Sequence, residues 1–95
     1  MAVVAITERH GDPKELLTQY DELSEKVFAL GPQPGHLSHT CVELPDGIRI
    51  VNTFDNEQHA RAFGERPEFQ AIFREAGLPP VEVQVLRVHN TRQIA

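Results

Sequence analysis

The spacing of apolar residues changes several times along the chain, and each change predicts a different element. Residues 2–7 form a continuous apolar run of strand length. Such a run is typical of a strand that is covered on both faces. His10 and Gly11 end it, so the first predicted element is a short buried strand.

Helical spacing follows that strand. Asp12 is predicted to cap a helix, with Pro13 in its first position and Glu15 at the spacing of a capping box. Gly31 is the predicted stop. The apolar side chains between them recur at helical intervals, which places them on one face. This face consists of Leu16, Leu17, Tyr20, Leu23, Ser24, Val27 and Phe28.

The middle of the chain predicts a hairpin. Residues 36–44 and 48–54 have the composition of strands, and the Pro45-Asp46-Gly47 segment between them has the residues of a tight turn. Asp55 then stands where a second helix can begin, and we expect it to be the cap.

The second helix is interrupted by a proline. Pro67 divides it into two predicted pieces, over residues 56–65 and 67–76, because proline cannot continue a helix from its interior. Gly77 ends the second piece. Residues 81–89 form the last predicted strand, and a short tail follows.

The order of elements is strand, helix, strand, strand, helix, strand. It predicts an α+β fold of the ferredoxin-like βαββαβ type, in one domain over residues 1–95. Right-handed crossovers place both helices on one face of a four-stranded antiparallel sheet. The strands are nevertheless apolar on both faces, so a second layer is needed. We expect a second copy of the chain to supply it, in a homodimer.

Charge and composition exclude several partners. The chain has 9 basic and 14 acidic residues and a formal net charge of −5, without a basic stripe. This pattern argues against nucleic acid and against an anionic membrane surface as partners. Cys41 is the single cysteine, and neither a signal peptide nor a membrane span is evident, so we expect a cytoplasmic protein.

Nearly the whole chain resembles a known group of proteins. In residues 50–58 a strand ends in an aromatic residue and passes into an acidic cap and a helix. The likeness continues through Ala62-Phe63 and Pro67-Glu68-Phe69, and in segments 34–39 and 88–90. With the order of elements, these stretches resemble the dimeric α/β-barrel superfamily and its antibiotic-biosynthesis-monooxygenase-like members. The resemblance implies a homodimeric barrel that acts on a small molecule.

Two departures narrow what the resemblance implies. Phe54 stands where the family usually has a tryptophan, and the chain contains no tryptophan. The chain also lacks a set of asparagine, tryptophan and histidine like that of the haem-degrading relatives. Both absences count against the reactions of the relatives that carry these residues, including haem degradation.

We expect a ligand pocket between the helices and the sheet, where an apolar cleft holds a few polar groups. Tyr20 lies at the centre of the apolar face of the first helix, so its hydroxyl needs a partner there. Asn52 lies on an otherwise apolar strand face, where it could orient a ligand oxygen or bond to neighbouring backbone. His59 borders the apolar edge of the second helix, as a base at the rim or as a surface residue.

The spacing of His36 and His39 suggests a metal pair, which we reject because residues three apart on a strand point to opposite faces. Only one of them could then face the cleft, and His39 is the better candidate, as a catalytic or a structural histidine. Cys41 could join it as a nucleophile or be a small core residue. The glycines of residues 31–35 precede a strand, so we expect neither a nucleotide nor a flavin, and no other spacing suggests a metal.

Three functions remain open on this evidence. The first is a cofactor-independent monooxygenase, isomerase or cyclase that acts on an aromatic or polyketide-like molecule. In it, His39 or His59 deprotonates a phenol or enol, and Tyr20 and Asn52 hold the oxyanion. The second is a non-catalytic binding or carrier protein for a small apolar or aromatic molecule, and the third is a structural partner of another enzyme. The predicted apolar wall of the cleft is formed by Phe54, Phe63, Phe69 and Phe73.

Overall fold

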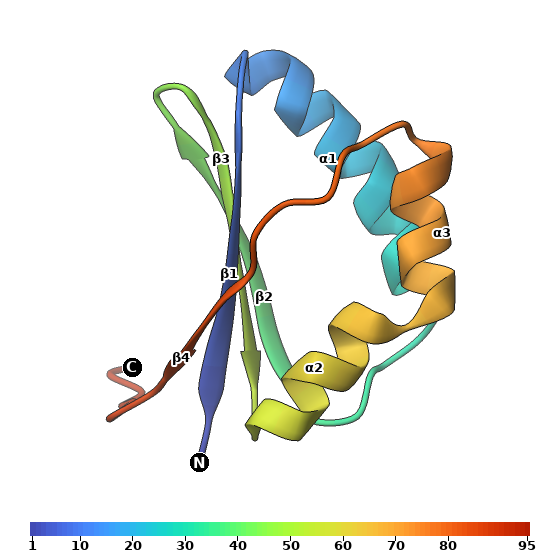
Figure 1. Ribbon diagram of the computed structural model, residues 1–95. Helices are drawn as coiled ribbons and strands as arrows, with labels where there is room; N and C mark the ends of the chain where they lie inside the picture. Colours follow the sequence, from blue (N-terminus) through green and yellow to red (C-terminus); the bar gives the residue numbers. More distant parts are fainter.

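The computed structural model describes residues 1–95 and contains one four-stranded antiparallel sheet with its helices on one side (Figure 1). The strands lie in the order β2-β3-β1-β4. This is the predicted ferredoxin-like βαββαβ arrangement, with the second helix divided at Pro67. The elements are β1 (Val3–His10), α1 (Pro13–Phe28), β2 (His36–Leu44), β3 (Gly47–Phe54), α2 (Glu57–Glu65), α3 (Pro67–Glu75) and β4 (Gln84–Arg87).

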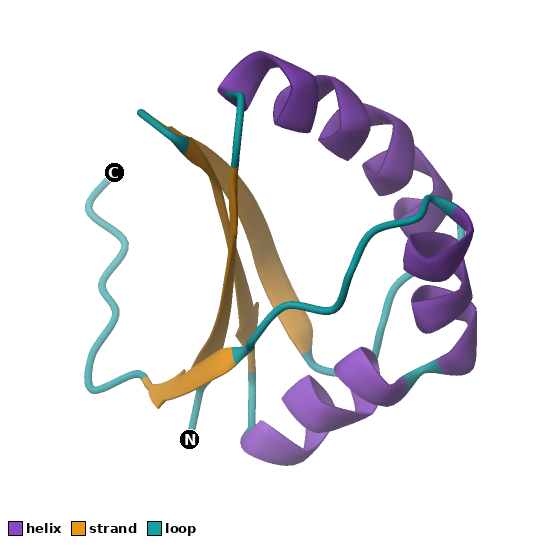
Figure 2. Cartoon of the chain, turned by 45° about the horizontal axis from the view of Figure 1, so that its top comes forward, coloured by secondary structure: helices purple, strands orange, loops and turns teal.

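The two layers are seen side by side in Figure 2, with the helices on one face of the twisted sheet and the C-terminal tail running past the other. The buried core lies between α2 and the adjoining ends of β1 and β3. Val3 and Phe54 pair across these two strands, and Ala60 of α2 packs against them. Phe54 is 0% exposed, so this end of the sheet is the most completely covered part of the molecule.

The start of α1 follows the sequence prediction only in part. Asp12 is the N-cap and Pro13 opens the helix, as expected, and the backbone oxygen of Asp12 accepts from Leu16 N at 3.0 Å. The Asp12 side chain makes no capping hydrogen bond, so the predicted capping box is not formed. Gly31 ends the region with φ of +88°, a left-handed conformation that glycine adopts without strain.

The cap of α2 is Asn56, and the prediction of Asp55 was wrong by one residue. The Asn56 side chain accepts from His59 N at 2.8 Å, which satisfies one of the free donors at the helix start. Asp55 is used differently, because its carboxylate lies 2.5 Å from the His59 ring.

The last strand is shorter than the predicted 81–89. It pairs with β1 only from Gln84 to Arg87, and one more backbone bond joins Val88 N to Ala2 O at 2.9 Å. Pro79 and Pro80 precede it and have no N–H groups, so the segment that follows α3 begins without ladder donors. β4 therefore forms a short, exposed edge.

The face of the sheet opposite the helices carries apolar side chains without a covering layer. Alternation along the strands assigns to it Val4 and Ile6 of β1 and Val51 of β3, all half-buried. Val42 and Leu86 on the same face are 38% and 44% exposed. None of the helices is long and apolar enough to cross a membrane.

Candidate functional site

A β-bulge at the start of β2 organises the candidate site. His36 pairs with Phe54, whereas Ser38 already pairs with Thr53, so Leu37 is an extra residue on this strand. The bulge shifts the alternation by one position, and both His36 and His39 face the helices. The prediction that these two rings point to opposite faces was therefore wrong. It assumed regular pairing, which the bulge interrupts.

Both rings meet at one side chain of β3. Asn52 pairs with His39 across the hairpin, and its side-chain oxygen lies 2.7 Å from His39 Nδ1. The same oxygen lies 2.8 Å from His36 Nε2. Helix α1 completes the network, because the Tyr20 hydroxyl lies 2.6 Å from His39 Nε2. Tyr20, His39, Asn52 and His36 thus form one continuous hydrogen-bonded chain, which we call the histidine network.

Burial raises the pKa of two groups at this site, Tyr20 of the network and the neighbouring Cys41. It raises the pKa of Tyr20, and Cys41 and Asp21 raise it further. It also raises the pKa of the Cys41 thiol, with Asp21 adding to the effect. Both groups therefore stay protonated near neutral pH. A protonated thiol is a poor nucleophile, and Cys41 makes no hydrogen bond to His39, so the geometry does not support the Cys–His pair.

A pocket of about 370 Å³ opens beside the network. It lies where the end of α1, the following loop, the start of β2 and one residue of α2 come together. His36 and His39 are the polar rings of its lining, and Phe28 and Phe63 are its aromatic walls. The lining contains no Asp, Glu, Lys or Arg. The remaining lining residues are Val27, Gly31, Pro32, Gln33, Leu37 and Ser38.

The four predicted phenylalanines form a row of ring contacts that starts in the core. Phe54 and Phe63 lie 5.2 Å apart, Phe63 and Phe69 lie 4.2 Å apart, and Phe69 and Phe73 lie 5.6 Å apart between ring centroids. Only Phe63 lines the pocket. Phe54 does not line the pocket but packs against a residue that does, because its ring stacks on His36 with 4.8 Å between centroids and 19° between planes.

The loop that borders the pocket is held at both of its ends. Gln33 accepts a hydrogen bond from Arg66, which lies between α2 and α3. Gly35 has φ of +70°, and a side chain there would collide with Asp55 and His59, whose atoms lie 2.2 Å from the position of a Cβ. His59 lies next to Gly35 but does not line the pocket, and its ring bonds to Asp55 and Asn56 and not to the histidine network.

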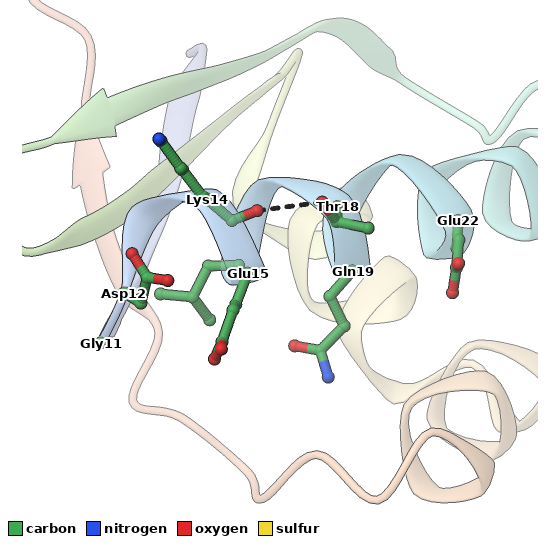
Figure 3. Close-up of a pocket in the computed structure, with 8 residues that line it drawn as sticks. Gly11, Asp12, Lys14, Glu15, Thr18, Gln19 and Glu22 are labelled. Carbon is green, nitrogen blue, oxygen red and sulfur yellow. Dashed lines mark hydrogen bonds between the residues drawn. The ribbon is translucent and has the colours of Figure 1, made fainter.

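A second hollow, of about 490 Å³, lies along the outer side of α1 (Figure 3). Glu15, Gln19 and Glu22 point the same way from the helix, and one side chain of its lining is hydrophobic. The only hydrogen bond drawn there joins the Thr18 hydroxyl to Lys14 O at 3.0 Å, within the helix itself. None of the predicted site residues lines this hollow.

Three of the predicted catalytic residues, Tyr20, His39 and Asn52, are thus brought together, and His59 lies in a separate cluster. The structure adds His36, which sequence reasoning had placed on the opposite face. Nothing in the sequence between the two histidines marks the bulge, so no local pattern could have predicted that His36 faces the helices. No group of three or more His, Cys, Asp and Glu side chains is arranged to hold a metal.

No protein-family profile matches the chain, and no curated protein matches its sequence. Solved structures do match. A provisionally assigned antibiotic biosynthesis monooxygenase from Chloroflexus aurantiacus J-10-fl has a TM-score of 0.67 at 20% identity, with 100% of both chains covered. SnoaB, a cofactor-independent oxygenase from Streptomyces nogalater, has a TM-score of 0.62 at 20% identity, with 95% of this chain and 92% of that chain covered.

A dimeric ferredoxin-like protein of unknown function from Jannaschia sp. CCS1 also matches. Its TM-score is 0.70 at 14% identity, over 93% of this chain and 100% of that chain. At these identities the likeness establishes the fold and leaves the reaction open. The chain therefore has the fold of the antibiotic-biosynthesis-monooxygenase-like, ferredoxin-like proteins, and this prediction from the sequence is confirmed.

Proposed function

We propose that this protein is a small-molecule-processing enzyme of the antibiotic-biosynthesis-monooxygenase type, with its active site in the pocket beside the histidine network. The observation that carries the proposal is the network itself, in which two imidazoles share the oxygen of Asn52 at 2.7 and 2.8 Å. Imidazole is the side chain best suited to move a proton near neutral pH. The likeness to a cofactor-independent oxygenase supports the same type of chemistry.

The pocket favours an aromatic or polyketide-like substrate. Phe28 and Phe63 offer ring faces, Val27 offers an aliphatic surface, and no charged side chain is present in the lining. A planar, uncharged molecule can bury its surface there without leaving a charge unpaired. Its phenolic or enolic hydroxyl would be placed against the polar end of the pocket, where the two histidines lie.

The proposed reaction begins with transfer of the hydroxyl proton to an imidazole. The resulting phenolate or enolate is rich in electrons. In an oxygenase it reacts with dioxygen as the second substrate, and in an isomerase or cyclase it takes up a proton or forms a bond at another carbon. Tyr20, whose raised pKa keeps its proton in place, serves as a neutral hydrogen-bonding group in this process.

We also propose that the working form is a homodimer. Only 7 of the 95 residues are buried in the single chain, and the open face of the sheet exposes apolar side chains. A second copy placed on this face would cover Val4, Ile6, Val51 and Leu86, and self-association is the common way to cover such a surface. Analytical ultracentrifugation at micromolar concentration should show a dimer, and a monomer would contradict the proposal.

The activity is tested by oxygen uptake. The protein is incubated with a panel of hydroquinones and anthrones, and products are identified by mass spectrometry. We expect substrate-dependent uptake that falls about 100-fold in Asn52→Leu, because Asn52 holds the imidazoles and a well-placed general base contributes on that order. Glu22→Gln, on the outer side of α1, is the matched control and should retain full activity. Conversion without oxygen uptake would indicate an isomerase or cyclase, and binding without conversion would indicate a carrier.

A further inference from the structure

The two histidines of the network differ in which nitrogen remains available. The side-chain oxygen of Asn52 is an acceptor, so His36 Nε2 and His39 Nδ1 both donate to it. A neutral imidazole has one N–H, and its other nitrogen therefore carries a lone pair. In His36 this second nitrogen is Nδ1, and in His39 it is Nε2.

The lone pair of His39 is already engaged. Its Nε2 lies 2.6 Å from the Tyr20 hydroxyl, which donates to it, and burial keeps that hydroxyl protonated by raising its pKa. His36 Nδ1, in contrast, makes no hydrogen bond to any group of the protein, and His36 lines the pocket. His36 is thus the one histidine of the network with an acceptor nitrogen left for a ligand.

The ring of His36 is also fixed in its plane. Phe54 stacks on it at 4.8 Å, and Phe63 lies 5.0 Å away at an angle of 47°. If the ring turned over about its Cβ–Cγ bond, the carbon Cε1 would replace Nε2 beside Asn52 and the present hydrogen bond would be lost. The aromatic contacts therefore hold the ring in its orientation. The bond to Asn52 holds the tautomer in which Nε2 carries the proton.

These contacts lead us to infer that His36, which the sequence pattern placed away from the cleft, is the proton acceptor of this site, and that Asn52, His39 and Tyr20 are positioning residues that hold it in the Nε2–H tautomer. The inference deepens the proposed function and rests on it for the choice of ligand. In the transfer, the O–H bond of a ligand phenol breaks and its proton binds His36 Nδ1. The ring becomes a cation with two N–H groups, and the ligand oxygen becomes an anion beside it.

The identity of the orienting group supports this role. Asn52 is a neutral amide, so it orients the ring through one hydrogen bond and adds no charge beside it. The titratable groups nearest the network are Tyr20 and Asp21 of α1 and His39 and Cys41 of β2. The Asp55–His59 pair lies against Gly35, and Arg66 bonds to Gln33, whereas β3 contributes only the uncharged Asn52 and Phe54 to the surroundings of His36. The pocket lining contains no carboxylate that could accept the ligand's proton in place of His36, and no Lys or Arg.

The first test reads the tautomers directly and needs no ligand. Long-range ¹H–¹⁵N correlation spectra of the uniformly labelled full chain distinguish Nε2–H from Nδ1–H rings. The five histidines are assigned with His36→Gln and His39→Gln variants. We expect Nε2–H for His36 and Nδ1–H for His39. A His36 ring protonated at Nδ1 in the neutral state would overturn the inference.

The second test uses para-nitrophenol, whose anion is yellow and whose neutral form is not. It is titrated with the protein at a pH where free para-nitrophenol is mostly neutral. We expect wild type to raise the phenolate absorbance and His36→Gln to lose this increase completely. His36→Phe keeps the stacking on Phe54 and Phe63 and should lose it as well. His39→Gln should retain part of the increase, and His10→Gln, the matched control whose ring bonds to Asp46 at the turn between β2 and β3, should retain all of it.

The outcomes separate this inference from the proposed function. An unchanged phenolate signal in folded His36→Phe, or no signal in wild type, would overturn the role of His36. A signal lost in His39→Gln and kept in His36→Gln would do the same, because it would assign the acceptor to the other ring. The predicted tautomers and phenolate signal, found together with no turnover of any substrate, would confirm the inference and contradict the proposed enzyme.

Discussion

Two histidine clusters lie close to the same loop, and they differ in the charge of the partner that holds the ring. In the pocket, His36 and His39 bond to the neutral amide of Asn52. At the start of α2, His59 bonds to the carboxylate of Asp55 at 2.5 Å. A carboxylate favours the protonated ring, whereas an amide orients the ring without adding charge. The first arrangement suits proton transfer, and the second suits fastening a loop.

The clusters also differ in what surrounds them. His36 is partly buried and contacts the rings of Phe54 and Phe63, while the side chains of His59 and Asp55 are 37% and 47% exposed. Solvent weakens the contact between Asp55 and His59, so its contribution to stability is small. The loss of packing behind the pocket has a larger effect, because Phe54 is fully buried there. The predictions below follow this difference.

The largest effect is expected from the residue that joins the two clusters. Phe54 is fully buried, stacks on His36 and immediately precedes Asp55. Phe54→Ala should lower the free energy of unfolding by about 3–5 kcal/mol, because a large core side chain is replaced by a cavity. Urea denaturation followed by circular dichroism measures this loss. Phe54→Leu should lose much less, and equal losses in the two variants would contradict the cavity explanation.

The next effect concerns the loop between the clusters. Gly35→Ala should lower the free energy of unfolding by about 2 kcal/mol, because a left-handed residue with a Cβ is strained and the new Cβ would displace the Asp55–His59 pair. Gly64 is the matched control. It lies within α2 with nothing near its Cβ position, so Gly64→Ala should raise the free energy of unfolding by about 0.5–1 kcal/mol.

Tyr20 provides a spectroscopic probe of the pocket cluster, because it is the only tyrosine and the chain has no tryptophan. Its pKa is raised in the folded state, mainly by burial. The unfolded chain therefore releases this proton first as pH rises. The stability linked to Tyr20 is complete below about pH 10, the range of free tyrosine, and is lost as pH rises through the folded-state pKa.

An absorbance titration of tyrosinate should accordingly show a midpoint above that of free tyrosine, and urea unfolding across the same pH range should show the fall in stability. Tyr20→Phe should reduce this fall and leave only the part due to Cys41, whose pKa is also raised. A tyrosinate midpoint at the value of free tyrosine would contradict the burial of this hydroxyl.

The smallest effect is expected at the Asp55–His59 pair. His59→Gln should lower the free energy of unfolding by no more than about 1 kcal/mol, and added salt should reduce the difference further. A double-mutant cycle with Asp55→Asn measures the pair directly. A coupling of several kcal/mol would show that the two clusters are alike in energy, and the contrast between them would fail.

Much of the frame of this site follows from local features of the sequence. The Pro45-Asp46-Gly47 turn sets the hairpin so that Leu44 pairs with Gly47, and the same register carried back along the strands pairs His39 with Asn52. The apolar face of α1 likewise placed Tyr20 on the side of the sheet. Three members of the network could therefore be predicted before the structure was known.

The sequence by itself determined the order of the elements, the ferredoxin-like fold and the apolar face that remains uncovered, because apolar spacing, turns and caps act over a few residues. Only the tertiary structure decided which histidines share the site. The bulge at Leu37, which no local pattern marks, turns His36 onto the face of His39. The charge of each partner then separates His36 from His59. Asn52 reaches His36 only when β3 pairs with β2, whereas Asp55 lies four residues before His59 in the chain.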